Sequence, residues 1–379
     1  MTKTVLLTLG RLPKALELAR AFASAGWRVV IAEPFAWHVA RLSRDVDRSL
    51  TVTAPAVDRL CYLNDLLEII ACERVNLVVP VSEETMHVAA LHGRLPLGVE
   101  LYCPSQAALL QVHDKFAFIG RAERHGLPVP NTFRADTEEA AALASGGPHV
   151  IKPIFSCSGK GVTINTAAQP LMPENRTSSL IVQDFVPGQV VSSFSIADKG
   201  RRVVTALYKG TVMSGTVSVA FERIDDVAAA HRWIDDFIAA ETYSGFISFD
   251  LVLGIDGRVS AIECNPRVTS GIHFLDERDV VAAMLSPRTA PPVRFKSQTR
   301  FQQFYPCLTE TQKSVFQGNR AKQNIKNLIS SRDVIWRLRD PLPFLFMPAT
   351  SYQILGMSIF EGLSFGEAAT RDIEWTAPN

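Results

Sequence analysis

The sequence lacks several features that mark particular protein classes. None of its six cysteines forms a CxxC pair, so we expect neither a thiolate metal site nor a disulfide framework, and a reducing compartment is favoured. No run of about 18 apolar residues occurs, and the N-terminal apolar stretch is interrupted by Gly10, Arg11 and Pro13, so neither a transmembrane helix nor a signal peptide is predicted. A net charge of +1 offers no general attraction for nucleic acid. We therefore expect a cytoplasmic protein without a membrane span or a nucleic-acid partner.

The composition predicts a globular protein of more than one domain. Hydrophobic residues make up 47% of the 379 residues and charged residues 20%, a balance that allows a large core. At about 150 residues per domain, the length has room for two or three domains. Shifts in composition divide the chain into an N-terminal α/β domain (1–103), a central domain (104–290) and a C-terminal packing region (291–379).

The N-terminal region carries the pattern of a parallel sheet. Largely apolar segments at 4–9, 27–32 and 75–81 read as covered strands, and apolar residues recur at helical spacing between the first two. The turn after the first strand lacks the later glycines of a dinucleotide fingerprint, so NAD is not predicted. Ser82–Glu84 follow the third strand at the edge where open sheets bind ligands, although such residues also serve as helix caps and first-turn acids.

The most informative segment runs from Ser248 to Arg267. Two apolar-rich stretches flank Asp256-Gly257, a signal for a two-residue hairpin turn in which Ile255 pairs with Arg258. Counting outward on that register brings two acidic side chains to directly opposed positions. A slip of one residue would instead place them on separate faces.

The opposed acids are Asp250 and Glu263, and Asn265 shares the face of Glu263. Carboxylates about 5 Å apart repel by roughly 3 kcal/mol at an effective dielectric near 20. A divalent cation reverses this repulsion, and two carboxylates with an amide oxygen suit Mg²⁺ bound together with substrate phosphates. Arg267, held just past the strand by a proline, is placed to reach an anion beside the metal. The alternative is a surface hairpin with solvated acids.

Upstream of the hairpin lie features suited to phosphate binding. Lys152 comes from a predicted strand that precedes a small-residue loop at 156–161, and Lys115 lies near a predicted helix. Glycines let backbone amides approach phosphate oxygens, and lysines supply the matching charge. The strand at 180–186 offers edge amides and carbonyls for an adenine ring. Each of these signals is weak by itself.

Their order along the chain resembles the ATP-grasp superfamily from about Lys115 to Arg267, and IECNPR with an aspartate 13 residues before its glutamate is the most specific element. The preceding region resembles the N-terminal domain of biotin carboxylases, and the tail resembles that of carbamoyl-phosphate-synthase-like proteins. The resemblance implies an α/β fold: a parallel N-terminal domain, then a two-part ATP-grasp fold with antiparallel sheets, its lid at about 120–187, and a C-terminal packing tail.

The resemblance also implies site residues. The ATP-binding residues are Lys115, Lys152, Ser156, Ser158, Gly159, Gly161, Gln183, Asp184, Phe185 and Val186. The ligands of Mg²⁺, with Mn²⁺ as an alternative, are Asp250, Glu263 and Asn265. The catalytic residues are Arg267, Lys152 and Lys209, and the substrate contacts are Arg267, Ser270, Gly271 and His273. For Lys209 and His273 a structural role is an equal alternative. Val190 stands where the family has a ribose-binding glutamate, and Ser192 or Ser193 are the candidate substitutes.

The implied activity is the ATP- and Mg²⁺-dependent joining of a carboxylate to an amine or similar nucleophile through an acyl phosphate, with release of ADP and phosphate. One alternative is a kinase-like or carboxyphosphate-forming enzyme on the same scaffold. Another is a non-catalytic nucleotide-binding regulator, which the departure at Val190 suggests. Expected partners are a small carboxylate and an amine, and relatives make a homodimer a further expectation. Residues 294–339, rich in Lys and Arg, are interpreted as a solvated helical face, and 341–365 as a buried tail.

Overall fold

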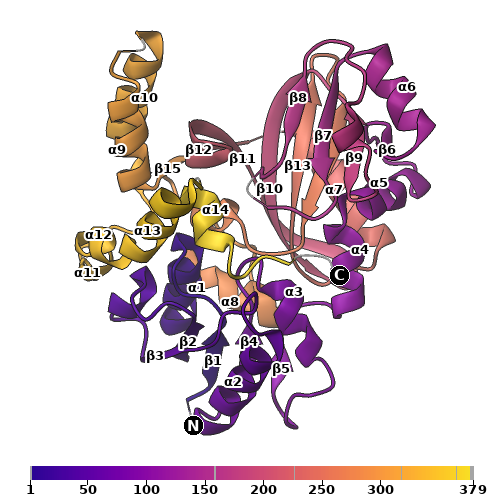
Figure 1. Ribbon diagram of the computed structural model, residues 1–379. Helices are drawn as coiled ribbons and strands as arrows, with labels where there is room; N and C mark the ends of the chain where they lie inside the picture. Colours follow the sequence, from indigo (N-terminus) through magenta and orange to yellow (C-terminus); the bar gives the residue numbers. More distant parts are fainter. Residues whose placement is uncertain (1, 158, 226, 317, 364, 376–379) are drawn as a thin grey trace.

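The computed structural model describes residues 2–157, 159–225, 227–316, 318–363 and 365–375. Three sheets organise the described part of the chain: a parallel sheet formed by the N-terminal region, a large central sheet, and a small sheet beside it (Figure 1). In these ranges no helix is both long enough and apolar enough to cross a membrane.

The N-terminal sheet is entirely parallel, as predicted. Its strands, in spatial order, are β3 (Arg48–Thr51), β2 (Arg28–Glu33), β1 (Thr4–Leu7), β4 (Leu77–Val79) and β5 (Glu100–Leu101). Alternate residues of β1 face opposite layers: Val5 and Leu7 pack with helix α1 (Pro13–Ser24), and Leu6 packs with α2 (Arg59–Cys72). Because both faces are covered, the strands read as continuous apolar runs. The strand order reverses direction between β1 and β4. The carboxyl ends of these two strands therefore form the switch point, where open parallel sheets bind ligands.

The central sheet has seven strands. In spatial order they are β14 (Val259–Asn265), β13 (Gly245–Gly254), β10 (Gly188–Asp198), β11 (Arg201–Ser214), β12 (Val217–Ile224), β15 (Arg300–Gln302) and β16 (Arg332–Asp333). Helices α5 (Lys115–Arg124) and α7 (Ala228–Ala240) cover one face, where Phe118, Trp233, Phe237 and Phe249 form an aromatic core. The opposite face packs toward the N-terminal domain.

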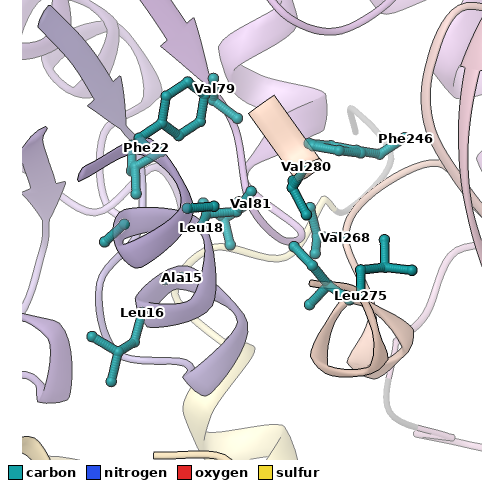
Figure 2. Packing of buried hydrophobic residues seen from close by; sticks show 14 of the residues in the cluster. Ala15, Leu16, Leu18, Phe22, Val79, Val81, Phe246, Val268, Leu275 and Val280 are labelled. Atoms are coloured by element: carbon teal, nitrogen blue, oxygen red, sulfur yellow. The ribbon is translucent and has the colours of Figure 1, made fainter. Parts of the chain in front are cut away.

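One hydrophobic cluster joins the parallel domain to the central sheet. Figure 2 shows Ala15 and Leu18 of α1 and Val81 facing Val268 and Val280, with Val280 contributed by α8 (Glu277–Leu285). These residues belong to the same buried cluster as Phe194 and Tyr208 of the central sheet. The two domains therefore share a core, which places the switch-point edge against the end of β14.

The small sheet is antiparallel. Its strands, in spatial order, are β6 (Thr132–Arg134), β9 (Leu180–Asp184), β7 (His149–Pro153) and β8 (Thr163–Asn165). Helix α6 (Glu138–Gly146) covers one face. The remaining short elements connect these layers: η1 (Val39–Leu42), α3 (Thr85–Val88), η2 (Ala89–Leu91), α4 (Gln106–His113), η3 (Pro173–Asn175) and η4 (Ser270–Phe274). The mixed α/β fold predicted from the resemblance is confirmed, whereas its domain boundaries stay predictions.

The C-terminal region contributes β15 and β16 to the central sheet and otherwise forms helices in its described residues. These helices are α9 (Phe304–Lys313), α10 (Asn319–Ser330), α11 (Leu342–Leu345), α12 (Met347–Thr350), α13 (Tyr352–Glu361) and α14 (Phe365–Thr370). The prediction of a buried tail over 341–365 is wrong for most of its apolar residues. Phe346, Ile359 and Phe360 are 51, 75 and 89% exposed, and only a few side chains such as Ile354 are buried. Helices α11, α12 and α13 lie at one side of the molecule (Figure 1).

The β13–β14 hairpin corrects the predicted turn. Leu253 pairs with Val259, and the loop has three residues, 255–257, rather than two. Gly257, with φ +77°, takes the left-handed position that closes three-residue hairpin loops. A bulge at Ile262 then adds a residue to β14, because Leu251 pairs with Ala261 while the preceding residue of β13 pairs with residue 263. The bulge offsets the longer loop, so the predicted pairing of the two acids is confirmed.

Candidate functional site

Two carboxylates meet on one face of the β13–β14 hairpin. Asp250 and Glu263 are direct cross-strand neighbours. The Asp250 carboxylate accepts a hydrogen bond of 2.6 Å from Ser192 Oγ, and the Asn265 amide nitrogen lies 3.4 Å from its other oxygen. Burial, and secondly the charge of Glu263, raise the pKa of Asp250 to about 6. Cys264, between the two candidate ligands Glu263 and Asn265, lies on the opposite side of the strand in the apolar core.

Lys152 reaches the acidic pair from the small sheet. Its ammonium donates to the Ile262 carbonyl at 2.8 Å and to Gln183 Oε1 at 2.9 Å. Since Ile262 is the extra residue of the bulge and has no cross-strand partner, its carbonyl is available to a side chain from another sheet. Burial lowers the pKa of Lys152 to about 8. The negative charge of Glu263 opposes this lowering, and the positive charge of Lys115 adds to it. Two of its three N–H groups are used, which leaves one for a ligand.

Lys115 connects the acids to the small-residue loop. It is the first residue of α5, whose N-terminus is capped by the Asp114 side chain through Ala117 N–H. The buried Lys115 ammonium donates to Ser156 O at 2.9 Å and to Ser156 Oγ at 3.2 Å, and lies 3.3 Å from Glu263 Oε1. The predicted nucleotide-binding residues Lys115 and Ser156 are therefore brought together beside the predicted metal ligands. Ser158 lies outside the described residues.

The two loop glycines adopt backbone conformations that favour glycine. Gly159 has φ +70° and Gly161 has φ +71°. A Cβ on Gly159 would lie 2.5 Å from Thr216 Cβ, between β11 and β12, and one on Gly161 would lie 2.9 Å from Pro153 Cγ. The loop thus packs closely against the central sheet, which a larger residue would prevent.

The predicted adenine segment lies at the junction of the two sheets. Gln183 accepts a hydrogen bond from Lys152, and its amide nitrogen is also hydrogen-bonded. Asp184 ends β9, and Phe185 and Val186 lead into β10. Phe185 is 37% exposed, so part of its aromatic ring is accessible just past the end of β9.

A second charged cluster forms where β14 ends. Arg267 Nη2 lies 2.5 Å from Glu83 Oε1 and donates to Asn265 Oδ1 at 3.0 Å. Glu83 follows β4 at the switch point, and its side chain is 1% exposed. Burial by itself would raise the pKa of Glu83, but Arg267 and the other nearby cationic groups have the larger combined effect and lower this pKa. Lys14 of α1 donates to the Val268 carbonyl at 2.8 Å. Burial and the nearby Arg267 lower the pKa of Lys14 to about 7. Lys14 has no motif around it in the sequence, so only the fold identifies it as a member of this charged cluster.

Lys209 and His273 have partners outside the acidic pair. Lys209 Nζ lies 3.7 Å from Glu222 Oε2 across β11 and β12. His273 Nδ1 lies 3.1 Å from Glu17 Oε2, and its ring stacks on Phe221. The structure places Lys209 as a strand lysine paired with a glutamate and His273 as a packed histidine, and their catalytic and substrate roles stay predictions.

The remaining predicted residues have mixed placements. Gly271 is buried, and a Cβ there would lie 2.4 Å from Phe194 Cβ, so this glycine permits close packing of η4 on β10. Ser270 begins η4 and is partly exposed. Val190 is 55% exposed on β10. Ser193 is fully buried and bonded to the backbone of β13, so it is not accessible to a ribose.

The end of the chain also reaches the loop. Lys160 donates to Glu374 Oε1 at 2.7 Å, and Cys157 Sγ lies 3.3 Å from Thr370 Oγ1. The sequence contains no signal for these contacts, because the partners are more than 200 residues apart and share no motif.

Comparison with known proteins agrees with this geometry. Residues 112–271 match the ATP-grasp domain family, which confirms the resemblance stated from the sequence. The match includes both lysines, the loop and the metal-ligand candidates.

Solved structures share the fold over most of the chain. The biotin carboxylase domain of Hydrogenobacter thermophilus 2-oxoglutarate carboxylase, solved with MgADP, ADP and bicarbonate, matches at TM-score 0.58 and 16% identity over 71% of this chain and 65% of that one. The ADP complex of Staphylococcus aureus N5-carboxyaminoimidazole synthetase matches at TM-score 0.60 and 14% identity, covering 78% of this chain and 80% of that one. An L-amino acid ligase from Bacillus licheniformis matches at TM-score 0.57 and 14% identity, covering 75% and 74%. The chain thus spans slightly less than two thirds of the length of the first of these proteins. At sequence identities of 14 to 16%, the structural likeness establishes the fold alone.

Proposed function

We propose that the protein, whose residues 112–271 match the ATP-grasp domain family, is an ATP- and Mg²⁺-dependent ligase joining a carboxylate to an amine or similar nucleophile. The observation that carries the proposal is the convergence of Lys115 and Lys152 on one acidic pair at the junction of two sheets. Neither lysine is near that pair in sequence. Buried cations beside carboxylates and a glycine loop suit a nucleotide whose phosphates bind lysines at one end and a metal at the other.

The acidic pair fits Mg²⁺. Asp250 and Glu263 supply hard carboxylate oxygens. The Asn265 amide oxygen, which accepts a hydrogen bond from Arg267 in this structure, would add a third donor once its amide turns toward the pair. Burial, and secondly the charge of Glu263, raise the pKa of Asp250, and a bound cation would offset both effects. Bound Mg²⁺ supplies neutralisation of charge on the phosphate oxygens, and Mn²⁺ suits the same donors. In this proposal Lys115 and Lys152 bind phosphates, and residues 183–186 hold the adenine.

The chemistry follows from the weakness of a carboxylate as an electrophile. A substrate carboxylate oxygen attacks the γ-phosphorus of ATP, the bond to the β-phosphate oxygen breaks, and ADP leaves. The amine then attacks the carbonyl carbon of the acyl phosphate, phosphate leaves with the bonding electrons, and the nitrogen loses a proton. Arg267, at the end of β14 beside Asn265, stabilises the negative charge on the phosphoryl oxygens. Positioning and charge stabilisation provide most of the rate in such transfers.

A carboxyphosphate-forming reaction is the second candidate. It is favoured by the structural likeness to a biotin carboxylase domain solved with bicarbonate and to N5-carboxyaminoimidazole synthetase. In that case bicarbonate takes the place of the organic carboxylate in the first step, and the acceptor nitrogen is carboxylated.

A phosphate-release screen separates the candidates. The purified protein is incubated with MgATP and a panel of carboxylic acids, including bicarbonate, each crossed with a panel of amines, and products are identified by mass. The ligase proposal expects phosphate release that needs both an organic acid and an amine. Release with bicarbonate in place of the acid supports the second candidate. Glu263→Gln is expected to abolish ADP formation, and a protein that binds ATP without turnover on any pair would contradict both.

A further inference from the structure

The last described stretch of the chain, residues 365–375, forms a strap that contacts the N-terminal domain. The Asp372 carboxylate accepts hydrogen bonds of 2.6 and 2.9 Å from the two terminal nitrogens of Arg11, and its carbonyl accepts one of 3.0 Å from Ala56 N–H. Trp375 is 6% exposed, and the rings of His87 and Trp375 lie 4.9 Å apart. In Figure 1 this yellow segment runs from α14 toward α3 and α4. The strap is therefore anchored at two points.

The same strap contacts the glycine loop of the site. Lys160 Nζ donates to Glu374 Oε1 at 2.7 Å, and Cys157 Sγ lies 3.5 Å from Glu374 Oε2. Cys157 Sγ also lies 3.3 Å from Thr370 Oγ1. At its other end, through Ser156, the loop is bonded to Lys115 of the phosphate site. One carboxylate of the strap thus lies against the segment expected to cover the ATP phosphates.

We propose that Glu374 is a positioning residue that holds the glycine loop through Lys160, and that it competes with the phosphates of the nucleotide for this lysine. The proposal rests on the proposed function, since it takes the nucleotide to bind under the loop. Binding of the nucleotide then releases the loop from the strap.

The competition follows from charge. The nucleotide brings several negative charges to a loop whose lysine is already paired with a carboxylate, and the anions repel each other while sharing one ammonium. Lys160 is 47% exposed and Glu374 13%, so the pair is partly screened and its replacement by phosphate is accessible. Because coupling between two binding events is reciprocal, a strap that weakens nucleotide binding is itself loosened by the nucleotide to the same extent.

The first test measures MgADP affinity of the full-length protein by titration calorimetry. Glu374→Gln keeps the shape of the side chain and removes its charge, and is expected to lower the Kd for MgADP about two- to fivefold, the range of a partly exposed ion pair. Glu138→Gln is the matched control, since Glu138 is an exposed carboxylate 3.7 Å from Arg176 and its loss removes the same charge elsewhere. Its Kd is expected to equal that of the wild type.

A double-mutant cycle isolates the pair. In a Lys160→Gln background, Glu374→Gln is expected to leave the Kd for MgADP unchanged, because the lysine over which the two anions compete is absent. An unchanged or higher Kd for the single Glu374→Gln variant would overturn the proposal. So would a gain in affinity that persists without Lys160, because it would then reflect net charge alone.

Hydrogen–deuterium exchange tests the strap both without nucleotide and with MgADP. Glu374→Gln and Asp372→Asn are each expected to raise exchange in peptides from 365–375 and 157–161, and MgADP is expected to raise exchange of 365–375 in the wild type. Unchanged exchange in these variants would overturn the holding role of Glu374. A wild-type protein that binds no MgADP by calorimetry would instead overturn the proposed function and the competition, while the exchange of the variants would still decide whether Glu374 holds the loop.

Discussion

Replacing Asp250 by Asn should make the protein more stable and less active. The Asp250 carboxylate is partly buried beside Glu263, and both its burial and the neighbouring charge disfavour its charged form. Asparagine keeps the size of the side chain and an oxygen that accepts the hydrogen bond from Ser192. It removes the charge that the proposed metal needs. A residue retained for metal binding at a cost in stability behaves in this way, whereas a residue retained for structure does not.

The magnitude follows from the pKa of Asp250, which rises from 3.8 to about 6 on folding. At 1.36 kcal/mol per pKa unit, ionising this group costs the folded protein roughly 3 kcal/mol relative to the unfolded chain. The folded state holds the proton more tightly, so wild-type stability falls as pH rises through about 4 to 6 and the full cost is present above that window. The weak contact with the Asn265 amide, at 3.4 Å, is lost in the variant. We therefore expect a net gain of about 1–3 kcal/mol above pH ~7.

Urea unfolding of the wild type and the Asp250→Asn variant at several pH values measures this difference. The gain should be absent near pH ~4 and reach its plateau above pH ~7, where it corresponds to a rise in Tm of a few degrees. Asp256→Asn is the control, because Asp256 lies on the same hairpin with its side chain 59% exposed and should show no such pH-dependent gain. MgADP should stabilise the wild type and fail to stabilise Asp250→Asn. A variant that is less stable than the wild type by the same amount at every pH would refute the reasoning.

Three further predictions address other parts of the site. Lys152→Met should raise the Kd for MgADP at least about tenfold through loss of a charge-assisted hydrogen bond. Wild-type affinity for MgADP should also fall as the pH rises through about 8, because the pKa of Lys152 is lowered to that value and its ammonium loses its charge there. A Kd that calorimetry finds unchanged across this pH range would contradict the prediction. Gly159→Ala should slow phosphate release about tenfold or more, because its Cβ would meet Thr216 at 2.5 Å. Gly257→Ala is the control, because Gly257 has φ +77° and a Cβ there would meet no atom within 4 Å. This control variant should lose about 1–2 kcal/mol of stability and keep its turnover. Equal turnover in the two variants would count against a role for the glycine loop. Glu83→Gln should lower the free energy of unfolding by about 3 kcal/mol, because the largely buried Arg267 loses its counter-charge; urea unfolding with an unchanged midpoint would show that the ion pair contributes nothing.

The hairpin shows how far pattern reasoning reaches. The pairing of Asp250 with Glu263 is predictable because side chains alternate along strands. The loop length is not, since Asp-Gly suits both two-residue and three-residue hairpins and only the backbone decides between them. The bulge at Ile262 is equally invisible in the sequence, because the carbonyl it exposes is stabilised by Lys152 from another sheet.

Surface packing was the least predictable property. The apolar composition of 341–365 predicted burial, yet Ile359 and Phe360 are mostly exposed. Composition reports how much apolar surface a segment has, whereas burial depends on whether another element covers it. The same limit applies to His273, whose neighbours on α1 and β12 decide between a ligand and a packed side chain.

The sequence by itself determined what depends on neighbouring residues: the apolar strands, the hairpin with its acids, the glycine loop, and the order of motifs that marks an ATP-grasp domain. Only the tertiary structure decided which distant charges meet. Lys14 lies 254 residues from Val268 and Lys160 lies 214 residues from Glu374, and each pair is joined by one hydrogen bond. Periodicity and spacing record contacts within an element or between adjacent ones. Contacts between remote segments form when domains pack on a shared core. No local sequence pattern around the residues involved predicts these contacts.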